Sequence, residues 1–409
     1  MAPIPRVFRI TGTCNNYPWG KKGRDSFAAQ LAAKSNEDFV IKDDEPYSEI
    51  WFGDYPDFPA RVHATGELLS DTINENHLAL LGENVMRTMD AQLPYLPKVL
   101  SIASALPLQI HPDKQLAEKL HLENPEKFTD PNHKPEIAVA LSKFEVFAGW
   151  KALSDISSVF NIPCLRRFIP DGTTTWTNET LREVARGLLQ ASPETVAEVE
   201  SDLKGLSRQA LEDLDHQGYI VDLLPRLQSQ YEATDPGSLV ALLCMNYVVL
   251  EPGQAIYIPA DGIHAYLSGD IIECMARSNN VLNTGFCPLS ARDNIDLFAD
   301  TLTFAETGKD DIMLPARKSN SSLKGKTTVY RPPIGEFDVL RVQLGHDEDE
   351  ELAGQRGPGV AIVVDGQGIL VGDGKEHFVR KGYVYFVAPN TPLLLQTHRS
   401  RLEMYIAVV

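Results

Sequence analysis

The sequence has few cysteines and no long apolar run. Its five cysteines among 409 residues are odd in number, lie far apart and include no Cys-x-x-Cys pair, so we expect a reduced, cytoplasmic protein. No run of about 18 apolar residues occurs, and the N-terminal stretch lacks the apolar core of a signal peptide. The sequence therefore predicts no membrane partner.

Positive charge is also scarce. Lysine and arginine number 38 against 56 acidic residues, which gives a net charge of −18 at pH 7. This charge argues against a nucleic-acid backbone or an anionic membrane as partner. An anionic substrate would need a locally basic pocket to offset the field of the whole protein.

The pattern of residues divides the chain into regions. Short alternating stretches with Pro- and Gly-rich turns indicate β structure in residues 1–150 and again in 241–320. A helical periodicity of 3.6 residues fills 151–240, and alternation continues through 321–409. We therefore expect a catalytic β domain made of the first and third segments, a helical domain between them, and a C-terminal β domain.

Two stretches resemble each other. "EPGQAIYIPADGIHAYL" and "RKGYVYFVAPNTPLLLQ" share a glycine turn, an aromatic and apolar strand, a proline and a second strand. A weak repeat of this kind predicts two copies of one β-barrel unit. The first copy contains His264, whereas the second has Pro392 or Leu393 near that place. We therefore expect the chemistry in the first copy and no metal site in the C-terminal domain.

The stretch "PLQIHPDKQLAEKL" places Gln109 and His111 two residues apart. Alternate residues of a strand point to the same face, so these two side chains can bind one ligand together. A histidine on the inner face of a barrel is often only a hydrogen-bonded core residue. The pair alone leaves both interpretations open.

Two further residues favour a metal. Glu136 begins the alternating stretch "EIAVAL", and His264 follows a turn. Two imidazoles, a carboxylate and an amide oxygen suit a divalent ion such as zinc. Ligation without cysteine is typical of a catalytic zinc with one position left for substrate or water.

Six ordered segments carry a family resemblance: "NNYPWG", "PYSEIWFG", "LPKVLSI", "QIHPDKQLAEKLH", "NHKPEIAVAL" and "IPADGIHAYLSGDIIECMARSNN". Together they resemble the type I phosphomannose isomerases from near the N-terminus to about residue 290. The resemblance implies a mainly β fold with a helical insertion (α+β), built from two cupin (jelly-roll) β-barrels and an α-helical domain. The metal ligands that it implies are Gln109, His111, Glu136 and His264.

The implied enzyme uses one zinc per chain to interconvert mannose 6-phosphate and fructose 6-phosphate, a precursor step for GDP-mannose. We expect a monomer or a weak homodimer. The reaction moves a proton between neighbouring carbons, so a base and an acid are needed besides the metal.

The resemblance also suggests residues for these roles. The candidate catalytic residues are Lys134, Tyr266 and Glu273, and the candidate substrate-binding residues are Trp19, Glu49, Lys98, Arg277 and Asn283. Each has a plainer interpretation, because a lysine at a strand edge is usually only solvated and a buried glutamate is usually only paired.

The segment after His264 departs from the family. Asn279, Asn283 and Leu289 stand where the family usually has charged residues. Losing a guanidinium removes a bidentate phosphate donor worth about 1.5–3 kcal/mol. Three hypotheses follow: an isomerase of reduced activity in which Arg277 or Arg292 compensates, a metal-binding relative acting on another sugar phosphate, or a non-catalytic sugar-phosphate sensor.

Overall fold

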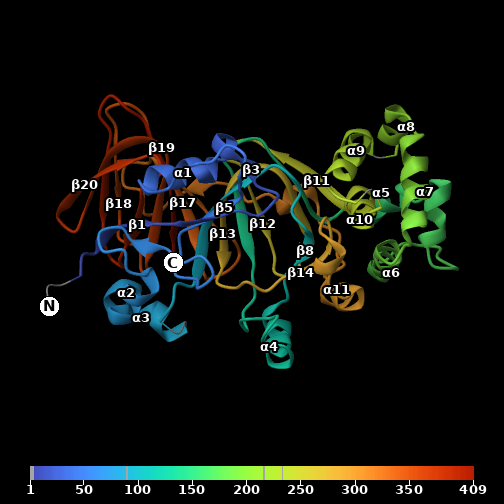
Figure 1. The fold of residues 1–409 in the computed structure, drawn as a ribbon, viewed down its shortest axis with the longest axis horizontal. Helices are drawn as coiled ribbons and strands as arrows, with labels where there is room; N and C mark the ends of the chain where they lie inside the picture. Colours follow the sequence, from blue (N-terminus) through green and yellow to red (C-terminus); the bar gives the residue numbers. More distant parts are fainter. Residues whose placement is uncertain (1–3, 89–90, 215–216, 233) are drawn as a thin grey trace.

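The fold comprises two β units and a helical block (Figure 1). The computed structural model describes residues 4–88, 91–214, 217–232 and 234–409. Figure 1 shows the C-terminal β unit at one end, the helical block at the other, and the first β unit between them. The predicted mainly β fold with a helical insertion is confirmed.

In the first unit, the long strand β13 (His264–Ala276) belongs to two sheets. Its first half pairs with β8 (Leu108–Ile110) and β10 (Phe144–Trp150). Its second half pairs with β7 (Tyr95–Ile102) and β9 (Glu136–Ala140). The other strands are β2 (Thr13–Asn15), β5 (Glu49–Trp51), β11 (Met245–Leu250), β12 (Ala255–Ile258) and β14 (Leu282–Gly285).

The second unit repeats this arrangement, with β22 and β23 together in the place of β13, and β19 in the place of β9 and β10. The order β2-β5-β7-β13-β9-β12 of the first unit corresponds to β15-β16-β17-β23-β19-β21 of the second. This confirms the internal repeat predicted from the sequence. The strands are β15 (Arg317–Lys318), β16 (Thr327–Tyr330), β17 (Asp338–Leu344), β18 (Asp349–Leu352), β19 (Gly359–Gly372), β20 (Lys375–Arg380), β21 (Val384–Val387), β22 (Leu393–Gln396) and β23 (Leu402–Val408).

The strand register shows which residues of the two units correspond. Gln109 on β8 pairs with His264 on β13, and at the equivalent point Leu352 on β18 pairs with Leu393 on β22. Two leucines therefore occupy the places of two predicted metal ligands. The second unit has apolar packing where the first unit has polar ligands.

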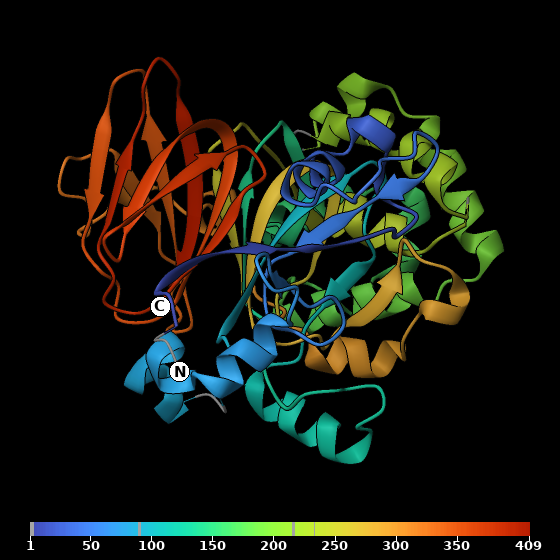
Figure 2. The ribbon, with the colours of Figure 1, turned by 60° about the vertical axis from the view of Figure 1, so that its left-hand side comes forward.

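The N-terminal strand joins the second unit. Strand β1 (Val7–Thr11) pairs with β21, and β6 (Arg61–Val62) pairs with β1. Figure 2 shows this dark-blue strand running to the red C-terminal unit. The two β units are thus linked by the start of the chain as well as by the segment before β15. The domain boundaries stay a prediction.

The helical block lies between β10 and β11 in the sequence. Ser192 caps its second long helix by accepting from the backbone N–H of Thr195, and Pro193 occupies the first turn, as the sequence predicts. Its helices are α5 (Leu153–Val159), α6 (Asn178–Leu189), α7 (Pro193–Lys204), α8 (Arg208–Glu212), α9 (Ile220–Gln230) and α10 (Gly237–Cys244). The last of these is buried along its whole length, so the block packs around it.

Shorter elements cover the β units. Helix α1 (Phe27–Ser35) packs on β5 and β7. The others are α2 (Leu69–Glu75), α3 (His77–Thr88), α4 (Lys114–Glu123), α11 (Ile295–Thr301), α12 (Lys309–Ile312) and the strand pair β3 (Lys21–Lys22) and β4 (Pro46–Tyr47). Within the described part of the chain, none of the helices has the length and apolar character needed to cross a membrane.

Strand β19 crosses between the sheets of the second unit at Gly366. This glycine has a φ of +75°, and a Cβ there would lie 1.8 Å from the carbonyl oxygen of Arg401. We expect Gly366→Ala to lower the free energy of unfolding by at least about 2 kcal/mol, because the clash is with backbone rather than with a movable side chain. The measurement is the midpoint of thermal or urea unfolding.

Gly325 provides a matched control. It has a φ of +79°, but a Cβ there would have no heavy atom within 4 Å. Gly325→Ala should therefore cost only the backbone strain, about 1 kcal/mol. Equal destabilisation by both variants would contradict the steric argument.

Candidate functional site

Three predicted metal ligands meet within the first unit. His111 follows β8, Glu136 begins β9 and His264 begins β13. One potential ligand atom from each lies within 4.8 Å of the others. Nε2 of His264 is 3.2 Å from Oε1 of Glu136, and Nε2 of His111 is 3.5 Å from Oε2. All three side chains are fully or almost fully buried.

Hydrogen bonds orient both imidazole rings. Nδ1 of His111 lies 2.8 Å from the carbonyl oxygen of Asn280, and Nδ1 of His264 lies 3.0 Å from that of Gly262. Each Nδ1 must donate to its carbonyl, and in a neutral ring a proton on Nδ1 leaves the Nε2 lone pair free. Burial lowers the pKa of His111 to about 3, so its ring is neutral, as metal binding requires.

The free atoms of the trio lack hydrogen-bond partners. Nε2 of His111, Nε2 of His264 and Oε2 of Glu136 are buried without a partner among the described residues. Leaving such atoms unsatisfied costs about 1–3 kcal/mol each. A divalent cation would satisfy all three at once, and the donor set of two imidazoles and a carboxylate suits zinc.

Gln109 lies beside the trio. It is the Cα partner of His264 across the β8–β13 pair, so the two side chains share one face of the sheet. On its other side Gln109 pairs with Asn283 of β14. Its role as the fourth ligand stays a prediction.

Sequence reasoning missed the residues that hold the His111 acceptor. The side-chain amide of Asn280 donates to the carbonyl oxygens of Asp130 and Asn132, at 2.7 and 3.0 Å. The Asp130 carboxylate also accepts from the hydroxyl of Tyr55. The Asp-Pro dipeptide in "FTDPN" signals a turn, but nothing in the sequence shows that this turn supports a metal ligand.

A buried ion pair lies on strands that flank the trio. Nζ of Lys98 is 3.2 Å from Oε2 of Glu273 and 3.8 Å from Oε2 of Glu49, and it lies 4.2 Å from the centre of the Trp51 ring. Burial raises the pKa of Glu273 to about 7, although Lys98 opposes the shift. Glu273 can therefore change its protonation state near neutral pH.

Two further candidates contact the trio. The hydroxyl of Tyr266 donates to Oε1 of Glu136 at 2.6 Å, and burial raises its pKa well above the usual range. Nζ of Lys134 lies 4.0 Å from Oε2 of Glu136, and burial lowers its pKa. Tyr266 and Lys134 thus contact the trio directly, whereas Glu273 contacts Lys98 and interacts electrostatically with Glu136.

The predicted substrate residues are less closely grouped. A cavity of about 420 Å³ adjoins β8 and β14 and is lined by Trp19, Pro107, Tyr231, Phe286 and Cys287, among others. Of the described residues that line it, none is a lysine or an arginine. The cavity wall therefore offers no cation to a phosphate group.

Both arginines considered as substitutes for the phosphate donor are already bound to carboxylates. Arg277 donates to the buried carboxylate of Asp54. An NH2 nitrogen of Arg292 lies 3.0 Å from the buried carboxylate of Asp235. Oδ1 of Asn283 is buried and has no hydrogen-bond partner in the described part of the chain.

Comparison with known proteins gives consistent matches. Residues 7–153 match the family described as phosphomannose isomerase type I, catalytic domain. The mannose-6-phosphate isomerase of Saccharomyces cerevisiae is 34% identical, with 99% of each chain covered, and that of Cryptococcus neoformans is 36% identical over the same shares.

Solved structures match over the same length. A mannose 6-phosphate isomerase bound with zinc and yttrium has a TM-score of 0.82 at 25% identity and covers 99% of this chain and 100% of its own. The Salmonella typhimurium mannose 6-phosphate isomerase bound to fructose 6-phosphate and zinc also has a TM-score of 0.82 at 25% identity, and it covers 99% of this chain and 100% of its own.

Proposed function

Because the chain belongs to the type I phosphomannose isomerase family, we propose that it binds one zinc ion and interconverts mannose 6-phosphate and fructose 6-phosphate. The observation that carries this proposal is the set of three buried ligand atoms without partners, on His111, Glu136 and His264. Relatives covering 99% of the chain carry the name of this isomerase. The reaction places the protein in mannose metabolism, where it supplies a precursor of GDP-mannose.

Gln109, His111, Glu136 and His264 would hold the ion. Zinc bound there supplies positive charge that stabilises the negative charge developing on the sugar oxygens. Carbonyl acceptors fix both rings, and Tyr266 fixes the Glu136 carboxylate. The ligands are thus oriented before the ion arrives.

The proton moves between C1 and C2 of the sugar. Glu273, with a pKa of about 7, is the base that takes the proton from one carbon and returns it to the other. Lys98 keeps the carboxylate in place through its 3.2 Å contact. Lys134 donates a proton to the carbonyl oxygen of the open-chain sugar and regains one from the hydroxyl on the neighbouring carbon as that hydroxyl becomes the new carbonyl. Burial lowers the pKa of Lys134 and so makes proton release easier.

The substrate lies against Trp19, with its phosphate toward Asn283. The side-chain NH2 of Asn283 would be a neutral donor in place of a charged one, while Arg277 and Arg292 are held by carboxylates. Glu49 contacts Lys98, so its role is to position that lysine rather than to bind the sugar. We therefore expect a working but slow isomerase.

The test follows fructose 6-phosphate formation from mannose 6-phosphate by purified, zinc-loaded protein, with Asn283→Arg alongside. The guanidinium should raise kcat/KM about tenfold or more, because a charge-assisted hydrogen bond to phosphate contributes about 1.5–3 kcal/mol. The backbone N–H and C=O of Asn283 each form a 2.7 Å hydrogen bond with Asp293. Because the side chain takes no part in these bonds, the substitution of Asn283 by arginine should leave β14 in place.

Asn178→Arg is the matched control, since it adds the same charge at an exposed helix start outside the site. It should leave kcat/KM unchanged. No conversion of mannose 6-phosphate by folded, zinc-bound wild type and Asn283→Arg would contradict the proposed function.

A further inference from the structure

The cavity of about 420 Å³ beside β8 and β14 lies close to the predicted metal ligands. Pro107 lines it and stands two residues before Gln109, a rise of about 7 Å along an extended chain. Trp19 also lines it and packs on the apolar cluster that contains Tyr266, whose hydroxyl donates to Glu136. An open-chain sugar with C1 and C2 at the metal ligands can therefore extend its C6 end into this cavity.

Among its described lining residues, this cavity has no cation and one anion, Glu232. The titratable groups Tyr231 and Cys287 also line it, and both are neutral at pH 7 because burial raises the pKa of each, that of Cys287 to about 11. A phosphate dianion in the cavity would meet a carboxylate and no lysine or arginine, in a chain whose net charge is −18.

Nearby cations are held outside the cavity. Nε of Arg292 donates to the carbonyl oxygen of Cys287 at 3.3 Å, and an NH2 nitrogen lies 3.0 Å from the buried carboxylate of Asp235. Turning this guanidinium into the cavity would leave that carboxylate buried without a counter-charge. Lys98 and Lys134 contact carboxylates of the buried cluster and do not line the cavity.

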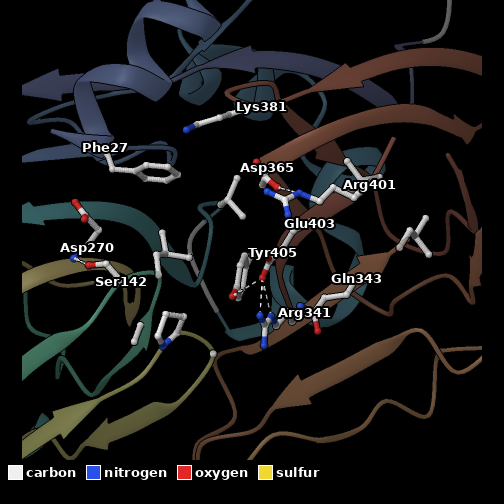
Figure 3. Close-up of a pocket in the computed structure, with 17 residues that line it drawn as sticks. Phe27, Ser142, Asp270, Arg341, Gln343, Asp365, Lys381, Arg401, Glu403 and Tyr405 are labelled. Atoms are coloured by element: carbon white, nitrogen blue, oxygen red, sulfur yellow. Dashed lines mark hydrogen bonds and ion pairs between the residues drawn. The ribbon is translucent and has the colours of Figure 1, made fainter. Parts of the chain in front are cut away.

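The acidic composition of the chain does not by itself explain this lack of cations. A larger cavity, of about 500 Å³, lies between the two β units, and Figure 3 shows Arg341, Lys381 and Arg401 on its walls. Among the described residues, the chain thus places cations in a cavity that contains no predicted metal ligand and none in the cavity beside those ligands.

The remaining wall suits an uncharged, hydroxylated group. Trp19 and Phe286 give it aromatic surface, on which C–H groups can pack. Ser104 and Gln230 give it a hydroxyl and an amide, which form hydrogen bonds without a charge. The hydroxymethyl end of a plain hexose has this mixed character, whereas a phosphate group does not.

We propose that the candidate site also isomerises unphosphorylated aldohexoses, with the hydroxymethyl end of the sugar in this cavity. The inference rests on the proposed isomerase function and extends its substrate class to neutral sugars. The proton on C2 of the aldose moves to C1, and the hydroxyl proton on O2 is replaced by one on O1. Aldose and ketose have the same formula, so no further reactant is needed.

The test measures kcat/KM of the zinc-loaded, full-length protein for D-mannose and for mannose 6-phosphate, following the two ketoses by NMR. A neutral hydrogen bond contributes roughly two- to tenfold, whereas two charge-assisted bonds to phosphate contribute about a hundredfold or more. We therefore expect kcat/KM for mannose 6-phosphate to exceed that for mannose by no more than about tenfold.

Glu232→Lys should raise this ratio of kcat/KM values at least about tenfold, because it replaces the carboxylate of the cavity wall by a cation that can donate to phosphate. Glu376→Lys is the matched control, since it makes the same charge change at an exposed residue of β20 in the second unit. The control should leave the ratio unchanged. Both positions are exposed, so both variants should fold.

The outcomes separate this inference from the proposed function. Conversion of mannose 6-phosphate with no conversion of mannose, or a ratio above about tenfold in folded, zinc-bound wild type, overturns the inference and leaves the proposed function intact. Conversion of mannose alone supports the inference and contradicts only the phosphorylated substrate, while conversion of neither sugar overturns both. Equal ratios in Glu232→Lys and Glu376→Lys would show that the sugar does not reach this cavity, which also overturns the inference.

Discussion

His264→Ala is expected to remove zinc from the protein and to abolish isomerisation. The variant loses one of two imidazoles whose Nε2 atoms are buried and free of other partners. Since loss of a group that only orients a ligand already lowers metal affinity about 10- to 100-fold, loss of the ligand itself should exceed that range. Turnover should fall at least about 1,000-fold, because charge stabilisation by the ion is lost with it.

Two measurements check this expectation: the zinc content of the purified variant and its melting temperature with and without added zinc. Zinc should raise the melting temperature of wild type but not of the variant, because only a folded state that binds the ion is stabilised by it. His377→Ala removes a histidine from β20 of the second unit and should retain zinc and activity. A His264→Ala protein with a full zinc complement would show that the trio is not the metal site.

The metal site could be anticipated because its signals are local. Gln109 and His111 share a face through the alternation of a strand, and Glu136 and His264 each stand at the start of a strand. The strand pattern alone did not predict that the four side chains meet, because β9 and β13 are antiparallel and Glu136 pairs with Met275 at the far end of β13. The family resemblance was needed to group them. The repeat itself predicted which unit would carry them, and the register places Leu393 opposite Leu352 in the other unit.

The ion pairs of Arg277 and Arg292 could not be predicted from the sequence, because their partners lie far away along the chain. Arg277 and Arg292 looked free to replace a missing phosphate donor. In the structure they contact Asp54 and Asp235, carboxylates buried in other segments of the chain. A buried carboxylate holds a guanidinium strongly, since separating them would leave an uncompensated charge.

Strand pairing between distant segments was equally impossible to predict from the sequence. Strand β1 reads as an ordinary alternating stretch near the start of the chain, yet it pairs with β21 near the end. The cavity between the β units follows from that kind of contact, because Phe27 comes from the start of the chain and Lys381 and Arg341 from its last third. Side chains that meet only through tertiary packing leave no periodic signal in the sequence.

Glu273→Gln should lower kcat about 100- to 10,000-fold while zinc content stays unchanged, because a general base contributes about that factor and glutamine cannot accept the proton. Glutamine has nearly the same shape and still offers an oxygen to Lys98, which lies 3.2 Å from the carboxylate. The measurements are kcat and the zinc content of the same preparation. Glu350→Gln provides a control, since Glu350 is a fully buried carboxylate of the second unit. That control should retain kcat even where it lowers stability.

The pH profile separates a base from a residue that only supports the fold. Burial raises the pKa of Glu273 to about 7, so the active carboxylate form is lost as the pH falls through that value. The kcat of wild type should therefore fall on the acid side of about pH 7, and the residual activity of Glu273→Gln should lack that acid limb. A kcat of Glu273→Gln within tenfold of wild type, or an acid limb that persists in the variant, would assign the proton transfer to another residue. Because Lys134 belongs to the same charged cluster, it would then be the next candidate.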